Sequence, residues 1–432
     1  MIYRKNMQSK LKTNISDEYF DKYLFYNCES HNIIGIPYVD YFNKRLKFNN
    51  EMNFDNDKLK IWYVRNDDCA NFVYGDNKDQ IESTIPIEIV ELVNKKEVFL
   101  VLSTGSEFDC DHFWDKVVDY CVEIGINKKN IHFITSNIKT HLPNSHSFKY
   151  SGLPHSKYDV GVCWLDKYGD IFPYTDEYID KFKNVDKEKK FLCLNAHYRE
   201  HRHYLYYKLF HYNLLSKGIF SFTLGQGINH VEHEKERMID EWKSYSEHLD
   251  VENYDESITI LNFLPINVEQ DNFWEEYYEV SNPKLKKIND KYRPWTLKDI
   301  NMIEKTYFNI STESNCDGDH GKFSYFSEKA LLGWITQPTI LLGTPHTIKH
   351  FKNLGYESFD ELFDESYDDI MDNDERQKKV IQEILRVCEM DEKKLKDICF
   401  DLLPKVQHNQ RVLFEHDSIE EFAGFLESIT ND

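Results

Sequence analysis

The chain has 432 residues, more than one hydrophobic core usually supports, so we expect two domains of about 150 to 250 residues each. A hydrophobic share of 41% with a charged share of 30% excludes a largely disordered chain, and the aromatic share of 15% predicts a core rich in Phe and Tyr. The formal net charge of −22 opposes the broad electrostatic attraction to phosphates that nucleic-acid binding needs, so we do not expect a nucleic-acid partner.

Cysteine usage and hydropathy predict a cytoplasmic protein. The nine cysteines are scattered, without a CxxC pair or metal-ligand spacing, which is typical of reduced thiols. The charged N-terminal residues 1–14 are followed by no apolar stretch, and the best apolar run, 330–343, is interrupted by polar residues and a proline. We therefore expect neither a signal peptide nor a membrane span. The Asn- and Lys-rich composition suits an AT-rich viral genome, for which the location would be the host cytoplasm.

The first half of the chain contains one clear βαβ pattern. Alternating apolar residues near 59–63 predict strands among the first ninety or so residues, but not their order. A continuous apolar run at 98–102 is followed by a polar turn, a helical pattern over 113–124 and a second apolar run at 131–134. Strand, helix and strand in this order predict part of a parallel sheet.

A second set of elements begins after the charged segment 180–190, which we interpret as an interdomain linker. An apolar run at 191–194 predicts a strand, and the polar segment 195–203 separates it from an aromatic helix over 204–215. A further strand is expected at 219–222.

The clearest pattern lies further on. A strand is expected at 307–310, a polar loop then leads to a helix that starts at Ser327, and another strand covers 339–342 and ends in Gly343-Thr344-Pro345. This is again a βαβ unit, whose carboxyl edge faces the start of the helix. Three helices are expected in the remainder of the chain, at 375–390, 391–403 and 419–428.

The start of the predicted helix is a candidate phosphate site. Ser327 is a plausible N-cap, and Glu328 and Lys329 follow it. Free N–H groups and the positive dipole end favour an anion there, and the Lys329 ammonium adds a full charge. Considered alone, the Ser-Glu-Lys tripeptide is more often an ordinary capped helix with solvated side chains.

The sequence around this helix resembles a known family. The three runs YFNISTE at 307–313, FSEKALL at 326–332 and QPTILLG at 337–343 resemble the donor-site signature of the α-1,3-fucosyltransferase family. LGY at 354–356 and DESYD at 364–368 also resemble a group of viral and phage proteins regarded as glycosyltransferases.

The resemblance assigns roles to particular residues. It implies that Glu328 contacts the ribose and Lys329 the phosphates of a sugar nucleotide. It covers roughly 307–368 and the strand near Phe191. It departs from the family because Ser327 replaces Thr, the helix between Lys329 and Pro338 is slightly shorter, and Gln337 stands near the point where the family prefers Gly. Fucose and guanine are therefore not implied, and a UDP- or GDP-sugar is expected without a tightly bound cofactor. Mg or Mn is compatible with such a donor but not required.

The polar segment NAHYREHRH at 195–203 provides the second half of the expected donor site. Arg199 and Arg202 can hold a pyrophosphate through bidentate donors and stabilise the leaving diphosphate, as the resemblance implies for an arginine in this region. Asn195 begins this segment and Glu313 ends the run 307–313, and these two residues complete the predicted set of donor-binding residues. The alternative is a solvated helix start with ordinary ion pairs.

No metal ligands are assigned. Four histidines, His197, His201, His203 and His211, invite comparison with a zinc site, but no Cys or carboxylate completes a known spacing. Asp317-Gly318-Asp319 is similar to the metal-binding DxD pair of the other major glycosyltransferase fold, and such a sequence is more often a turn.

A displacement that inverts the anomeric carbon needs a carboxylate base. Glu107 and Asp109 follow the strand at 98–102 and are our candidates for it, although either could instead cap the next helix.

Together these features predict an α/β, GT-B-like protein with two Rossmann-like domains facing a cleft. Residues 1–180 would form the acceptor-side domain and 181–404 the donor domain, with 405–432 as a helical segment that packs back toward the first. The expected function is transfer of a sugar from a nucleotide sugar to a glycan, lipid or protein. The alternatives are a phage-type sugar transferase acting on DNA and a non-catalytic binding protein. A P-loop enzyme is excluded, since GxxxxGK[ST] is absent.

Overall fold

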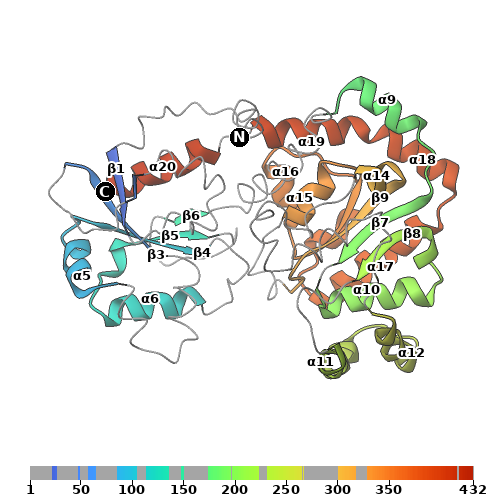
Figure 1. Cartoon of the computed structure of the whole chain (residues 1–432), viewed down its shortest axis with the longest axis horizontal. Helices are drawn as coiled ribbons and strands as arrows, with labels where there is room; N and C mark the ends of the chain where they lie inside the picture. Colours follow the sequence, from blue (N-terminus) through green and yellow to red (C-terminus); the bar gives the residue numbers. More distant parts are fainter. Residues whose placement is uncertain are drawn as a thin grey trace, which may run out of the picture. The chain divides into compact units, whose positions relative to one another are not determined.

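The computed structural model divides the chain into two compact units (Figure 1). The first comprises residues 1–159, 322–328 and 414–432, and the second comprises 160–321 and 329–413. The structure describes residues 22–26, 47–48, 57–64, 85–104, 113–135, 147–149, 174–195, 197–222, 231–264, 266, 300–317, 328–415 and 418–431.

The expected linker at 180–190 lies inside the second unit, so this prediction is wrong. Its first half ends helix α9 (Asp176–Asn184), and its last residues begin strand β7 (Lys189–Asn195). Between them the ammonium of Lys187 donates to the carbonyls of Phe182 at 3.1 Å and Glu304 at 2.7 Å. The expected boundary at residue 180 therefore differs from the division at 159, and 414–432 group with the first unit.

The first unit contains a parallel sheet of six described strands in the order β2-β1-β3-β4-β5-β6. Its strands are β1 (Tyr23–Tyr26), β2 (Lys47–Phe48), β3 (Leu59–Val64), β4 (Phe99–Thr104), β5 (Ile131–Thr135) and β6 (Ser147–Lys149). Its helices are α5 (Ile87–Asn94), α6 (Phe113–Glu123) and α20 (Ser418–Thr430), with the 3-10 turn η2 (Lys128–Asn130).

The core of the first unit explains why β4, α6 and β5 form where the sequence predicts them. Leu100 and Leu102 of β4 and Phe133 of β5 are buried against Val117 and Cys121 of α6, in one apolar cluster. Strands in the interior of a parallel sheet are covered on both faces, so they read as continuous apolar runs. The predicted βαβ unit is confirmed.

The second unit contains a parallel sheet of four described strands in the order β10-β9-β7-β8. Besides β7 its strands are β8 (Gly218–Phe222), β9 (Thr306–Thr312) and β10 (Thr339–Leu342). Besides α9 its helices are α10 (Glu200–His211), α11 (Val231–Tyr245), α12 (Tyr254–Thr259), α14 (Ile300–Glu304), α15 (Glu328–Trp334), α16 (Thr347–Asn353), α17 (Asn373–Glu389), α18 (Glu392–Asp401) and α19 (Leu403–Glu415). Its 3-10 turns are η4 (Leu215–Lys217), η5 (Ser246–His248), η6 (Ile260–Phe263) and η7 (Glu365–Asp369).

Helices cover both faces of the second sheet (Figure 1). On one face lies α15, where a Cβ added to Gly333 would come within 2.6 Å of the Asn309 amide of β9. On the other face lie α10 and α17, which pack against each other. All residues of β9 are buried, as expected for an interior strand.

The first three strands of each sheet are arranged in the same order. In each sheet the first strand lies between the second and the third, so the chain moves to one side and then reverses. In open α/β sheets, ligands bind outside the carboxyl ends of the strands at such a reversal. In the second sheet this point lies between β7 and β9.

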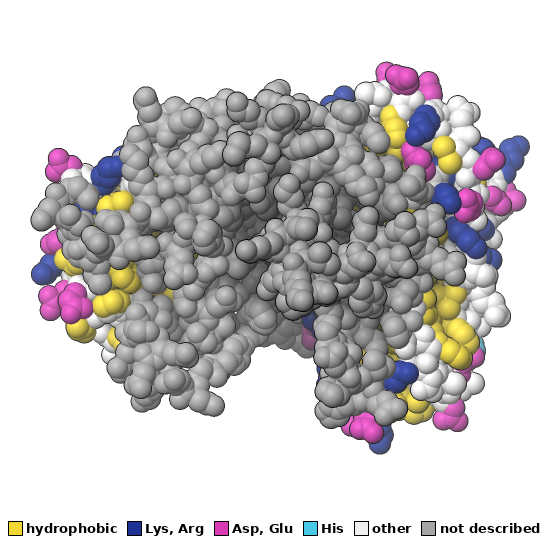
Figure 2. Space-filling model, in the orientation of Figure 1, with side chains coloured by type: hydrophobic (Ala, Val, Ile, Leu, Met, Phe, Trp, Pro, Cys, Tyr) yellow, Lys and Arg dark blue, Asp and Glu magenta, His cyan; other side chains and the backbone are white. Residues whose placement is uncertain are grey.

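The fold class is therefore α/β with two parallel sheets, as predicted. Among the described residues no helix is long and apolar enough to cross a membrane. Acidic and basic side chains alternate over the described surface around α9 and α18, where they do not form a face of one sign (Figure 2).

Candidate functional site

The reversal in the second sheet brings together two polar segments from different parts of the chain. Asn195 is the last residue of β7 and pairs with Phe222 of β8, while Thr312 is the last residue of β9. The Thr312 hydroxyl donates to the Asn195 side-chain oxygen at 2.5 Å, and both residues are buried. This contact connects the two strands at the sheet edge where the next residues of each segment emerge.

Two cationic side chains converge on Ser314, two residues beyond β9. Arg199, which precedes α10, donates from Nε to the Ser314 carbonyl at 3.2 Å. Lys329, in the first turn of α15, donates from Nζ to the Ser314 hydroxyl at 3.5 Å. Arg199 is exposed and Lys329 is half-buried, so both lie where a ligand at the sheet edge can reach them. They are two of the three cationic residues, Arg199, Arg202 and Lys329, that the sequence assigned to phosphate binding.

Arg202 has surroundings different from those we expected. Its side chain is 2% exposed and donates to the carbonyls of His197 at 2.9 Å and Glu313 at 2.9 Å, with a longer bond to that of Thr312 at 3.3 Å. A guanidinium with these partners fixes the loops after β7 and β9 to each other. We therefore assign Arg202 to positioning rather than to direct contact with a ligand.

Two of the four histidines are buried and neutral. His201 bonds through Nε2 to the Glu313 carbonyl at 2.9 Å, and burial, together with the nearby charge of Arg202, lowers its pKa to about 3. His203 bonds through Nε2 to the Ser257 carbonyl at 2.8 Å, and burial likewise lowers its pKa to about 3. Because a neutral imidazole must donate to a carbonyl, Nε2 carries the proton in both.

His211 lies on another part of α10, where Nδ1 meets the Glu256 carboxylate at 2.5 Å. Among the residues that the structure describes, no group of three or more His, Cys, Asp or Glu side chains has the arrangement of a metal site.

Glu313 is fully buried at the same edge. Its backbone N–H donates to the Leu342 carbonyl at 2.9 Å, which extends the pairing of β9 with β10 by one residue. A Cβ on Gly343 would lie 3.2 Å from the Glu313 Cγ, so the segment after β10 approaches this side chain closely. The Glu313 side chain is therefore not accessible to a ligand, whereas the Arg199 side chain is.

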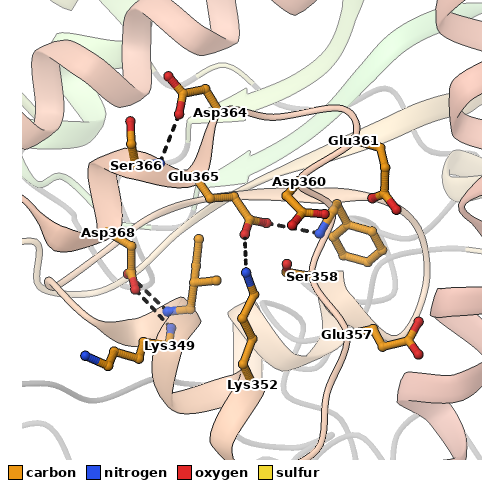
Figure 3. Close-up of polar contacts among 12 residues, drawn as sticks. Lys349, Lys352, Glu357, Ser358, Asp360, Glu361, Asp364, Glu365, Ser366 and Asp368 are labelled. Carbon is orange, nitrogen blue, oxygen red and sulfur yellow. Dashed lines mark hydrogen bonds and ion pairs between the residues drawn. The ribbon is translucent and has the colours of Figure 1, made fainter.

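The acidic motif after β10 caps backbone rather than facing solvent (Figure 3). The two carboxylate oxygens of Asp368 accept the N–H groups of Ile348 at 3.0 Å and Lys349 at 2.9 Å, at the start of α16. Glu365 accepts the Phe359 N–H at 3.0 Å and the Lys352 ammonium at 2.9 Å. Burial raises the pKa of Asp368 to about 6, although both N–H groups favour its charged form.

The remaining predicted site residues are not tested by this geometry. Glu107, Asp109 and Ser327 lie outside the described residues. Glu328 begins α15, but its side chain lies outside the described part. Asp317 of the Asp-Gly-Asp turn is exposed after β9, and the other two residues of that turn lie outside the description.

Sequence reasoning missed Arg376, which lies in the first turn of α17. Its guanidinium is 1% exposed and donates to the carbonyls of Cys316 and Gly343, in the segments after β9 and β10. The surrounding sequence, NDERQKK, is that of a solvated helix start, and only the isolation of one Arg among acidic residues could have drawn attention to it.

Comparisons with protein-family models, with the curated proteins and with the solved structures find no match for this chain.

Proposed function

We propose that the second unit binds the diphosphate of a nucleotide sugar at the β7–β9 edge, and that the protein is a GT-B-type glycosyltransferase. The observation that carries the proposal is the convergence of Arg199 and Lys329 on Ser314. Two cations from separate elements at the reversal of a parallel sheet match a ligand with more than one negative oxygen.

The local charge explains how an acidic protein can hold such a ligand. The chain carries a net charge of −22, so binding must come from a small basic region rather than from the overall field. Arg199 and Lys329 provide that region, and α10 begins directly after Arg199, which adds the positive end of its dipole. A planar guanidinium and a compact ammonium together suit a diphosphate.

The step from phosphate binding to sugar transfer rests on the resemblance to the fucosyltransferase donor site. In the proposed reaction an acceptor hydroxyl attacks the anomeric carbon, the bond to the diphosphate breaks, and the leaving nucleoside diphosphate takes the electron pair. Arg199 and Lys329 stabilise the charge that develops on it. The acceptor, a glycan, lipid-linked sugar or protein, would bind mainly to the first unit, where Glu107 or Asp109 would accept the hydroxyl proton in an inverting reaction.

A thermal-shift panel tests the donor site. Wild-type protein and the Lys329→Ala variant are heated with UDP, GDP, CMP, ADP or dTDP, each with and without Mn. At about one hundred times its dissociation constant a ligand stabilises the fold by roughly 2.7 kcal/mol, a shift of a few degrees. We expect one diphosphate to stabilise the wild type and to lose this effect in Lys329→Ala. Lys393→Ala, at an exposed lysine of α18, is the matched control and should respond like the wild type.

A second assay separates an enzyme from a binding protein. The sugar nucleotide of the diphosphate identified by the panel is incubated with the protein, and release of free diphosphate is followed with and without candidate acceptors. Binding without any release would favour the non-catalytic alternative. No shift with any nucleotide would contradict the donor site itself. Tight, salt-sensitive binding to DNA would instead support the DNA-modifying alternative.

A further inference from the structure

Arg376 connects the two loops that border the candidate site. From α17 its Nε donates to the Gly343 carbonyl at 3.1 Å, directly after β10, and its Nη2 donates to the Cys316 carbonyl, four residues after β9. Both strands end at the edge where Arg199 and Lys329 meet. One side chain therefore connects the segments that follow two neighbouring strands, β9 and β10.

The other hydrogen bonds of Arg376 go to residues at the start of α17 and just before it. Nη1 donates to the carbonyls of Ile370 at 2.9 Å and Met371 at 3.3 Å, and Nη2 also donates to the Asn373 side-chain oxygen at 2.9 Å. Every acceptor is thus a neutral oxygen, while the side chain is 1% exposed. A charge buried in this way is unfavourable unless its hydrogen bonds are well made, so its contribution lies in the geometry that it imposes.

The segment around Cys316, to which Arg376 donates, makes further close contacts with Gly343. The Cys316 thiol donates to the same Gly343 carbonyl at 3.8 Å, and burial keeps this thiol neutral by raising its pKa to about 12. Gly343 also lies close to the Glu313 side chain, 3.2 Å from a Cβ placed on it. The short stretch between Glu313 and Cys316 is therefore held at both ends, and Ser314 lies within it.

We propose that Arg376 is a positioning residue that fixes Ser314, and through it the spacing of Arg199 and Lys329, for a diphosphate ligand. This inference rests on the proposed function. Arg376 itself is buried away from the ligand and acts only through the loop. A lysine cannot replace it, because an ammonium on a flexible stem cannot direct donors at Gly343 and Cys316 in one plane.

The test compares Arg376→Lys with Arg386→Lys in the full-length chain. Arg386 lies further along α17 and donates to the Leu362 carbonyl and to Glu383, both away from the candidate site, so it controls for the loss of a guanidinium from this helix. Two readouts are taken: hydrogen exchange of the peptide covering 306–317, without ligand, and the dissociation constant of inorganic pyrophosphate by calorimetry. Both are measured well below the thermal transition of each variant.

We expect Arg376→Lys to speed exchange at 314–317 and to weaken pyrophosphate binding about tenfold, while Arg386→Lys changes neither. Added guanidinium at millimolar concentration should partly restore affinity in an Arg376→Ala variant. Unchanged exchange in Arg376→Lys would overturn the inference, as would faster exchange with unchanged affinity. If the wild type binds neither pyrophosphate nor any nucleoside diphosphate, the proposed function is overturned, and the exchange measurement alone then decides whether Arg376 fixes the loop.

Discussion

Arg199 and Lys329 donate to two oxygens of one residue, the carbonyl and the hydroxyl of Ser314, although they belong to different elements of the second unit. Ser314 thus sets how far apart the two cations lie. Residues that share a partner do not act independently when a ligand binds between them.

The first prediction concerns this coupling. Arg199→Ala and Lys329→Ala should each weaken binding of the nucleoside diphosphate about tenfold, because each removes one charge-assisted hydrogen bond. The double variant should lose less than the product of the two, since one cation alone no longer orients the diphosphate and so contributes less once the other is gone. Calorimetry on the four proteins measures this. Losses that multiply without any coupling would show that the two cations do not serve one anionic group.

The second prediction concerns Asp368, which caps α16 through two backbone N–H groups. Asp368→Ala leaves both donors without their acceptor and should lower the free energy of unfolding by about 1–2 kcal/mol. Its neighbour Asp369 provides the control, because its side chain is 77% exposed and its ion pair to His346 spans 3.6 Å. Asp369→Ala should change stability by less than about 0.5 kcal/mol. Urea denaturation followed by circular dichroism compares them, and equal losses would refute a capping role.

Much of the second unit could be predicted because its strands are continuous apolar runs. β7, β9 and β10 lie where these runs predict them, and parallel strands bring their carboxyl ends to one edge. It was therefore foreseeable that the polar residues following β7 and β9 would meet. The choice between Arg199 and Arg202 was not, because both stand in one polar segment. The start of α10 separates them: Arg199 precedes the helix, and Arg202 is buried in its first turn.

Buried and half-buried charges account for what the sequence could not reveal. Arg376, Asp368 and Lys187 all stand in charged runs that are typical of solvated surface or linkers. In the structure each is satisfied by backbone groups: carbonyls for the two cations and N–H groups for the carboxylate. Backbone groups are the same at every position in the sequence, so no residue pattern shows which of them will be left available by the fold.

The third prediction concerns acid sensitivity. Burial lowers the pKa of His203 to about 3, well below the value of 6.5 expected for an exposed imidazole. Between these values the unfolded chain binds a proton that the folded protein does not. The free energy of unfolding contributed by His203 is therefore fully present above pH 6.5 and is lost as the pH falls toward 3, by about 1.4 kcal/mol per pH unit.

His203→Gln tests this. In the wild type the Ser257 carbonyl accepts from His203 Nε2. A glutamine amide can still donate to this carbonyl but does not titrate. Urea denaturation at pH 7.5, 6, 5 and 4.5 should give a shallower dependence for the variant than for the wild type, and the measurement at pH 7.5 corrects for any loss of packing. Parallel curves for the two proteins would mean that His203 is not the neutral buried group that we describe.

The fourth prediction compares two helical glycines. Gly333 of α15 faces β9 and β10, and a Cβ there would lie 2.6 Å from the Asn309 amide and 2.9 Å from the Thr339 side chain. Within the described part of the chain, and leaving aside its own helix backbone and chain neighbours, no atom lies within 4 Å of such a Cβ on Gly424 of α20. Alanine favours helix in both places, so only the available space distinguishes them.

Gly333→Ala should therefore lower the free energy of unfolding by about 1–3 kcal/mol, as overpacking does, whereas Gly424→Ala should raise it by roughly 0.5–1 kcal/mol. Denaturation of both variants beside the wild type checks the signs. Because α15 carries Lys329 in the turn before Gly333, a shift of this helix away from β9 also moves the ammonium away from Ser314. Gly333→Ala should then weaken diphosphate binding without removing any charge, and a variant that is destabilised but binds with wild-type affinity would show that the position of Lys329 does not depend on this packing.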